Sequence, residues 1–200
     1  RVTDVVSPWA RPELVLGQRG FGPVRRWAHA DVALAMSVQC ARCEERLRGR
    51  LGGAAGDLGR PPAAWVPERH FEGASGSLGP WQWWRLARAE ASIVTAFRLR
   101  WRPWWSAPGL LWSDGPPDLR DADVIVMRDS TARLLALAQP DGMKARWLPE
   151  QGPVMDRSDV EASLAYLAGL SAAVRARLDA GGLATDPPVA WPGLMRAWMQ

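Results

Sequence analysis

The sequence predicts a mainly α-helical protein (α+β), a bundle of three long amphipathic helices with a small β-hairpin or meander inserted before the last long helix. Apolar residues recur at spacings of three and four along the segments 24–50, 80–102 and 158–180. Such spacing places them on one stripe of each helix, and a bundle buries the three stripes against one another. All 200 residues are expected to form a single domain.

The first predicted helix, 24–50, carries both cysteines on its apolar stripe. A zinc site is the alternative interpretation of these cysteines. Within one straight helix, however, His29 and Cys40 lie about 16 Å apart, too far for one shared ion. We therefore expect His29 to be a buried polar residue, the cysteines to be apolar core residues, and the protein to hold no metal or cofactor. The zinc ligands considered are His29, Cys40, Cys43 and His70.

Segment 51–80 predicts a long loop, because it is rich in Gly, Ala, Pro and Ser. It contains His70, the second of two histidines in the sequence. A lone histidine in a loop is interpreted as a surface residue rather than as a catalytic base. No Gly-x-Ser-x-Gly motif or Walker A loop occurs in the sequence.

The second predicted helix, 80–102, holds the densest run of tryptophan and arginine in the chain. Pro80 suits a first helical position, and Pro103 disfavours helical geometry at the residue before it. Glu90 falls within the apolar stripe, so we expect it to be a buried polar residue, which must be paired because an unpaired buried charge is costly.

The arginines of this segment lie off the stripe, and several tryptophans follow in the expected loop. We interpret them as a surface that binds nucleic acid or another protein, because arginine bonds phosphate and carboxylate and stacks on rings. The residues of this predicted surface are Arg85, Arg88, Arg98, Arg100, Arg102, Trp104, Trp105 and Trp112.

Segment 123–149 is predicted to be the small β element, with a tight turn at Pro140-Asp141-Gly142. The alternative for its first arm is a short helix capped by Ser130. Three acidic residues precede the apolar run 124–127 and offer oxygen ligands for Mg²⁺, although acids in such a turn are usually solvated. They are Asp118, Asp121 and Asp123.

The third long helix, 158–180, is predicted to begin at a capping box formed by Ser158 and Glu161. Gly181-Gly182 supplies its left-handed end. A short terminal helix is predicted over 192–199.

The composition limits the location of the protein. The net charge is +4, of which +6 falls in residues 1–100 and −2 in residues 101–200. Two cysteines argue against a disulfide framework, and no apolar run reaches the roughly 18 residues that span a bilayer. The first residues lack the apolar core of a signal peptide. We expect a cytoplasmic or virion-associated protein with no membrane contact.

The sequence favours binding over catalysis. Two histidines and no recognisable nucleophile motif leave no mechanism to assign, so we predict that the protein is not an enzyme. The predicted function is that of a non-catalytic subunit of a larger macromolecular assembly, such as a viral or nucleoprotein particle, anchored to other protein subunits through Trp and Arg. The alternatives are a nucleic-acid-binding protein that stacks bases on loop Trp and, least favoured, a small metal-dependent enzyme.

Overall fold

The computed structural model describes residues 1–11, 14, 17–54 and 66–182. The chain divides between Ala74 and Ser75 into two compact units, which are described separately below. We call residues 1–74 the N-terminal unit and residues 75–200 the C-terminal unit.

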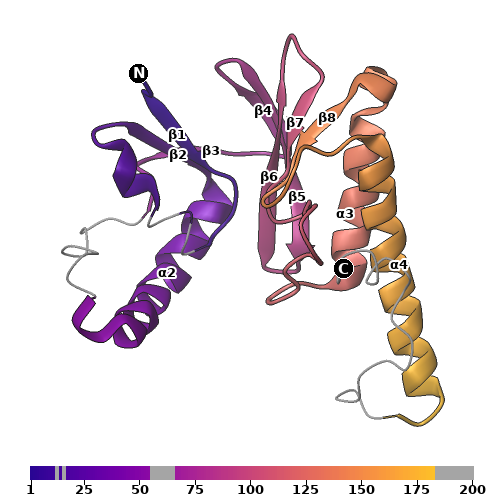
Figure 1. Ribbon diagram of the computed structural model, residues 1–200. Helices are drawn as coiled ribbons and strands as arrows, with labels where there is room; N and C mark the ends of the chain where they lie inside the picture. Colours follow the sequence, from indigo (N-terminus) through magenta and orange to yellow (C-terminus); the bar gives the residue numbers. More distant parts are fainter. Residues whose placement is uncertain (12–13, 15–16, 55–65, 183–200) are drawn as a thin grey trace. The chain divides into compact units, whose positions relative to one another are not determined.

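The N-terminal unit is built on a parallel sheet (Figure 1). Its strands run in the order β1 (Asp4–Ser7), β2 (Arg25–His29) and β3 (Arg69–Phe71). The 3-10 helix η1 (Gln18–Phe21) precedes β2, and the long helix α2 (Ala30–Leu51) follows β2 directly. Parallel neighbours need a crossover between them, and α2 is part of the crossover from β2 to β3.

The core of the N-terminal unit lies where α2 packs on β2 and β3. Ala28 on the strand and Val32 and Met36 on the helix are buried. Val32 and Met36 are four residues apart, which is about one helical turn, so this part of the apolar stripe expected from the sequence faces the core. Helix α2 begins at Ala30, whereas the residues before it form β2 rather than the start of the predicted helix 24–50.

The C-terminal unit is built on a five-stranded mixed sheet (Figure 1). The strands run in sequence order: β4 (Ser75–Leu78), β5 (Trp81–Ala89), β6 (Ser92–Leu99), β7 (Trp104–Ser106) and β8 (Arg146–Leu148). Neighbours from β4 to β7 are antiparallel, whereas β7 and β8 are parallel. A single crossover from β7 to β8 therefore carries the chain through the helical layer.

That helical layer consists of α3 (Val124–Leu137) and α4 (Arg157–Asp179), which run side by side in Figure 1. Helix α3 packs against β5 and against α4, and it is followed by the 3-10 helix η3 (Gln139–Lys144). Buried side chains of α3, α4 and the sheet form the core between the layers. They include Leu86, Val94, Met127, Leu134, Trp147 and Leu167.

The predicted three-helix bundle is wrong, because the described residues form eight strands in two sheets with helices packed on them. The predicted helix 80–102 is the antiparallel hairpin β5–β6, in which Trp83 pairs with Phe97 and Leu86 with Val94. Aromatic and β-branched residues suit a pleated sheet, and here cross-strand pairing satisfies them better than a helical stripe.

The predicted β element over 123–149 is also wrong in its first part, which is helix α3. The Asp123 carboxylate accepts hydrogen bonds from the Ile125 and Val126 backbone N–H groups and so caps the helix despite its β-branched start. Pro140-Asp141-Gly142 lies in η3 rather than in a hairpin turn. The predicted loop 51–80 contains β3 and β4.

Helix α4 begins at Arg157, close to the predicted start, but its capping box differs from the predicted one. Asp156 is the N-cap and accepts from the backbone N–H groups of Ser158 and Asp159, while the Asp159 carboxylate accepts from the Asp156 N–H. The predicted terminal helix 192–199 lies outside the described residues. None of the helices in the described part of the chain has the length and apolar character needed to cross a bilayer.

Candidate functional site

The carboxyl ends of the three parallel strands meet at one edge of the N-terminal sheet. Strand β1 ends at Ser7, β2 at His29 and β3 at Phe71. Ser7 is paired in register with Ala28, and His29 with Phe71. In parallel α/β sheets, ligands bind outside this edge, so we take it as the candidate active site.

His29 is the central side chain of this edge and is 3% exposed. Its Nδ1 accepts a hydrogen bond of 3.1 Å from the Asp31 backbone N–H, which makes His29 the N-cap of α2. Its Nε2 lies 2.9 Å from the carbonyl oxygen of Gly73, which can only accept. Nε2 therefore carries the hydrogen, and the imidazole is the neutral Nε2–H tautomer.

The contacts of His29 hold the segment after β3 in place. The Phe71 ring meets the imidazole edge-to-face, with 5.7 Å between the ring centroids. Gly73 has a φ of 104°, a conformation that favours glycine, and this geometry accompanies the contact of its carbonyl with His29. His29 thus acts as a positioning residue that joins the start of α2 to the end of β3.

Two exposed carboxylates lie beside His29 in sequence and register. Asp31 is in the first turn of α2, and its Oδ2 lies 3.7 Å from His29 Nδ1. Glu72 follows Phe71, the residue paired with His29, and is exposed. At the end of β1, Gln18 donates a short hydrogen bond from Nε2 to the buried Ser7 hydroxyl. The edge therefore carries two exposed carboxylates and a buried polar pair.

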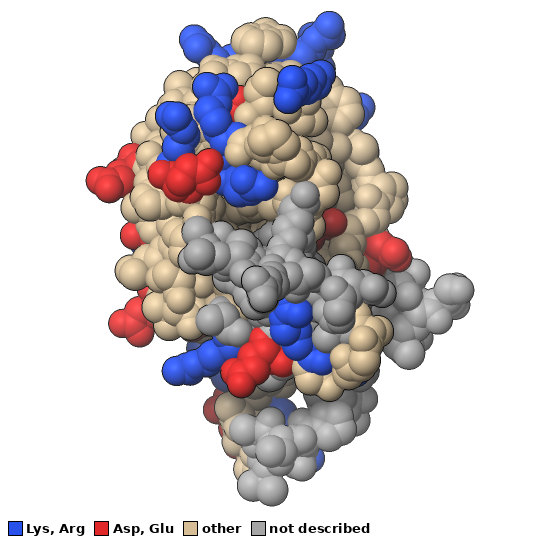
Figure 2. Space-filling model, turned by 90° about the vertical axis from the view of Figure 1, so that its left-hand side faces the viewer, with Lys and Arg blue, Asp and Glu red and all other residues tan. Residues whose placement is uncertain are grey.

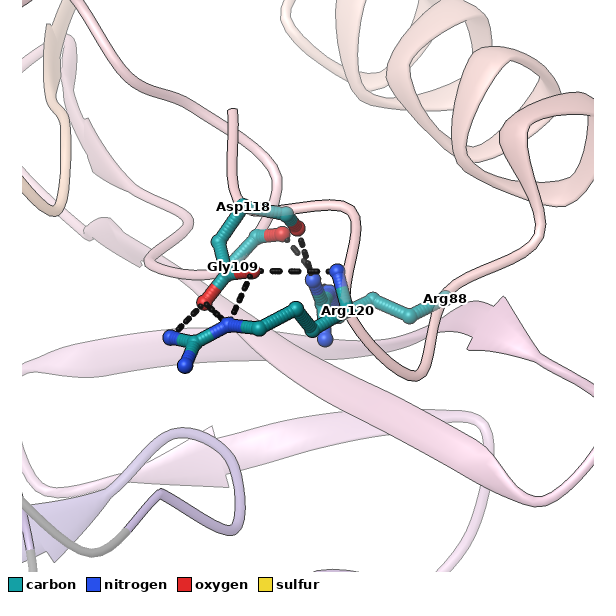
Figure 3. A network of polar contacts seen from close by, with 4 residues as sticks. All are labelled: Arg88, Gly109, Asp118 and Arg120. Atoms are coloured by element: carbon teal, nitrogen blue, oxygen red, sulfur yellow. Dashed lines mark hydrogen bonds and ion pairs between the residues drawn. The ribbon is translucent and has the colours of Figure 1, made fainter. Parts of the chain in front are cut away.

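Arg88, which the sequence predicted to face a partner, is instead buried in the C-terminal unit with 1% exposure. Figure 3 shows its side chain reaching from β5 to the loop before α3. Nε donates to the Gly109 carbonyl at 2.9 Å, and Nη2 donates a short hydrogen bond to the Asp118 carbonyl. The Asp118 carboxylate binds the Arg120 guanidinium at 2.6 Å. Arg88 therefore fastens this loop to the sheet.

Arg98 also has an internal partner. Its guanidinium binds the Asp141 carboxylate, which Trp105 contacts through its indole Nε1–H at 2.8 Å. The Trp105 ring stacks on Trp84, with 5.1 Å between the ring centroids. Arg98 lowers the pKa of Asp141 by hydrogen bonding, burial opposes this effect, and the Trp105 bond adds to the lowering. Trp105, predicted to bind a partner, is buried in this cluster.

The remaining predicted surface residues differ in exposure. Arg100, Arg102 and Trp104 are exposed, Arg85 is half-buried, and Trp112 is buried. Glu90 lies exposed in the β5–β6 turn, so the prediction that it is buried is wrong. On a helix, Glu90 would lie on the buried apolar stripe, whereas in the hairpin it lies in the turn between the two strands. The structure thus retains only part of the predicted surface, near the turn between β6 and β7.

The charge on the molecular surface is mixed. On the face drawn in Figure 2, blue basic and red acidic side chains are interspersed among tan atoms. Among the residues that the structure describes, no group of three His, Cys, Asp or Glu side chains could hold a metal ion. Two of the three acids considered for Mg²⁺ have other roles, since Asp118 binds Arg120 and Asp123 caps α3, while Asp121 is exposed.

Sequence reasoning missed Asp31 and Glu72 because the edge to which both belong depends on parallel pairing of β2 with β3. It also missed Trp101, Lys144 and Arg146, which are all exposed. Strand β2, RRWAH, shows no alternation of polar and apolar residues, so its sequence carries no period-two signal for a strand.

No protein-family model and no curated protein matches the sequence. Solved structures do share its fold. The DIM-1 metallo-β-lactamase matches with a TM-score of 0.56 and 10% identity, over 82% of this chain and 68% of that chain. A metallo-β-lactamase from Pontibacter korlensis matches with a TM-score of 0.55 and 15% identity, over 84% and 69%. The mono-zinc form of the metallo-β-lactamase FIM-1 from Pseudomonas aeruginosa matches with a TM-score of 0.57 and 17% identity, over 84% and 67%.

These matches establish an α/β fold similar to that of metallo-β-lactamases. They overturn the prediction of a helical, viral or nucleoprotein structural subunit, because the structures that share the fold are enzymes. The prediction that the protein is not an enzyme is corrected on the same ground. Of the alternatives predicted from the sequence, the small metal-dependent enzyme, which was least favoured, agrees best with the fold.

Proposed function

We propose that this protein is a hydrolase. The observation that carries the proposal is the likeness of its fold to metallo-β-lactamases over more than four-fifths of the chain. At identities of 10 to 17%, this likeness concerns the fold, and hydrolysis is the activity that the fold favours.

The proposed site is the carboxyl edge of β1, β2 and β3. Hydrolysis needs a group that accepts a proton from the attacking water, and an exposed carboxylate can do this. Asp31 and Glu72 supply carboxylates at this edge, on either side of the paired residues His29 and Phe71. Both ring nitrogens of His29 form hydrogen bonds within the protein, one with the Asp31 N–H and one with the Gly73 carbonyl. Its proposed role is therefore to position the start of α2 and the segment after β3 rather than to transfer a proton.

The zinc implied by the fold does not fit the residues of this chain. Catalytic zinc usually has three protein ligands, mostly His, Cys or carboxylate. The sequence has two histidines and two cysteines, and His29 uses both ring nitrogens within the protein. Cys40 is buried on α2, and the described residues hold no cluster of three donors. The proposed reaction is therefore assigned to the carboxylates, with no step through a metal.

The proposal is tested with purified protein and chromogenic substrates of four classes: a β-lactam, a carboxylic ester, a thioester and a phosphodiester. Each is assayed with added zinc and with a chelator. We expect turnover of at least one class, reduced about 100-fold or more in the variant that removes the proton acceptor, Asp31→Asn or Glu72→Gln.

The matched control is Glu90→Gln, which removes an exposed carboxylate from the β5–β6 turn and should leave turnover unchanged. Circular dichroism and melting temperature establish that each variant is folded. Absence of turnover for every class in both conditions would overturn the hydrolase proposal. Turnover that survives both substitutions would overturn the assigned site.

A further inference from the structure

Exposed cations and aromatic rings gather at one end of the C-terminal sheet. They come from the turn between β6 and β7 with the start of β7, and from the end of η3 with the start of β8, which the parallel pairing of β7 with β8 brings together. Trp104 is paired in register with Arg146. We call this set the Arg–Trp surface, and it consists of Arg100, Trp101, Arg102, Trp104, Lys144 and Arg146.

The backbone of the Arg–Trp surface is held by hydrogen bonds. Arg100 N–H donates to Pro80 O at 3.0 Å, Arg102 N–H to Leu99 O at 3.3 Å, and Arg146 N–H to Pro103 O at 2.8 Å. The backbone of both segments is thus fixed, and the Arg146 guanidinium also donates to the Met143 and Ala145 carbonyls. A backbone that is already ordered loses less conformational entropy when the surface binds a ligand.

The Arg–Trp surface is positive because nearby acids are few and already paired. Between residues 75 and 113 the sequence contains one acid, Glu90, and the strand register places Glu90 at the opposite end of the hairpin from Arg100. Two acids lie near the surface: Asp141, which Arg98 neutralises, and Asp156, which interacts electrostatically with Arg146. Among the described residues no carboxylate pairs with Arg100, Arg102 or Lys144, so their charges are available to a partner.

Aromatic rings alternate with these cations. Trp101 is 68% exposed and stands between two exposed arginines in sequence, while Trp104 is 36% exposed and lies beside Arg146. A large exposed indole ring in a fixed turn is a recognised feature of binding surfaces. Rings separated by guanidinium groups match a ligand in which flat apolar groups alternate with negative charges.

We propose that the Arg–Trp surface binds single-stranded nucleic acid, with bases stacked on Trp101 and Trp104 and phosphates bound by the surrounding cations. Unstacked bases and regularly spaced phosphates have the required alternation, and single-strand-binding proteins combine these same two contacts. An anionic bilayer is favoured less, since interfacial anchors gather their apolar residues on one side and their charges on the other. This proposal concerns the C-terminal unit and is independent of the proposed hydrolase site.

The test measures fluorescence anisotropy of a labelled twelve-residue oligothymidylate with the full chain at low salt. We expect saturable binding, and the affinity should fall with salt with a logarithmic slope of roughly −3, because four cations each contribute about 0.7 on a single strand. The double variant R100Q/R102Q should have about half that slope. Trp101→Ala should weaken binding roughly 5- to 100-fold, and Trp101→Phe should restore much of it because stacking is retained.

The matched control for charge is R133Q/R175Q, which removes two exposed arginines from α3 and α4. It should change neither the slope nor the affinity by more than about twofold. No binding of the oligonucleotide at low salt would overturn the proposal. An equal loss of oligonucleotide affinity in the two double variants would show that binding does not occur at the Arg–Trp surface. Sedimentation with vesicles of phosphatidylcholine and phosphatidylserine in the absence of oligonucleotide binding would replace nucleic acid with a membrane as the partner.

Discussion

Arg98 on β6 and Asp141 in η3 form a two-point ion pair, with Nε–Oδ2 at 2.7 Å and Nη2–Oδ1 at 2.5 Å. They are 43 positions apart in sequence. Trp105 donates a third bond to the same carboxylate. This cluster joins η3 to the sheet at the point where the Arg–Trp surface begins.

Asp141→Asn should destabilise the protein by about 2 kcal/mol at pH 7, because a half-buried charge-assisted pair loses one charge. Since Arg98 lowers the pKa of Asp141 in the folded state, the pair stabilises the protein above the unfolded pKa, about 3.9. That contribution is lost as pH falls through the folded pKa. The difference in unfolding free energy between wild type and variant should therefore shrink from pH 5 toward pH 2, measured by urea denaturation.

Asp129→Asn is the control for this pH experiment. It removes an exposed carboxylate that pairs with Arg128 on the surface of α3, and such pairs contribute about 0 to 1 kcal/mol. A difference between wild type and Asp141→Asn that stays constant from pH 5 to pH 2 would contradict the assigned role of the ion pair.

Arg88→Met should cost about 3 kcal/mol of unfolding free energy. The substitution keeps apolar volume but leaves the Gly109 and Asp118 carbonyls without their donor, and unsatisfied buried groups cost about 1–3 kcal/mol each. Arg88→Lys should be nearly as destabilising, because one ammonium cannot reproduce the guanidinium fork. Chemical denaturation measures both. Arg133→Gln, at an exposed position on α3, should change stability by less than about 0.5 kcal/mol. If Arg88→Met leaves the free energy of unfolding unchanged, the buried cation does not hold the loop.

His29→Ala should destabilise the N-terminal unit by about 1–3 kcal/mol, since both the helix cap and the bond to Gly73 are lost. His29→Asn should lose less, because an Asn side chain can still accept from the Asp31 N–H. Hydrogen exchange of the Asp31 amide, together with denaturation, separates the two effects. Equal protection of that amide in all three proteins would rule out the capping role.

The sequence analysis succeeded where a local pattern decides the structure. The apolar spacing in α2 and the acidic start of α4 depend on residues a few positions apart, and both helices exist close to where they were expected. Even there, the cap of α4 is Asp156 rather than Ser158, because acid and hydroxyl residues crowd the same turn and several of them can cap.

The analysis failed where pairing between distant segments decides the structure. The hairpin β5–β6 turns at Glu90-Ala91, which contain no Gly, Pro or Asn to signal a turn. All five residues from Ile93 to Phe97 are buried, so the period of two that identifies a strand is hidden. The run Ile93-Val94-Thr95 was the available signal, because β-branched residues favour strands.

The candidate sites also contain residues that a local pattern predicts and residues that only long-range strand pairing brings in. Arg100, Arg102 and Trp104 could be predicted as surface residues because they cluster in sequence. Lys144 and Arg146 join them only through the parallel pairing of β7 with β8, and Glu72 belongs to the same edge as Asp31 only through the pairing of β2 with β3. Register of this kind cannot be derived from one sequence, since it depends on the whole sheet.

Zinc should not stabilise this protein, although it shares its fold with metallo-β-lactamases. A ligand that binds the folded state raises its stability by about 2.7 kcal/mol at a hundredfold excess over Kd, which would shift the melting temperature by several degrees. With two histidines in the sequence, and with His29 bound to Asp31 N–H and Gly73 O, we expect no shift with zinc or with a chelator. Tag-free protein and elemental analysis after dialysis give the measurement. One zinc ion retained per chain, with a melting temperature lowered by chelator, would show that this chain builds a metal site from a different set of donors.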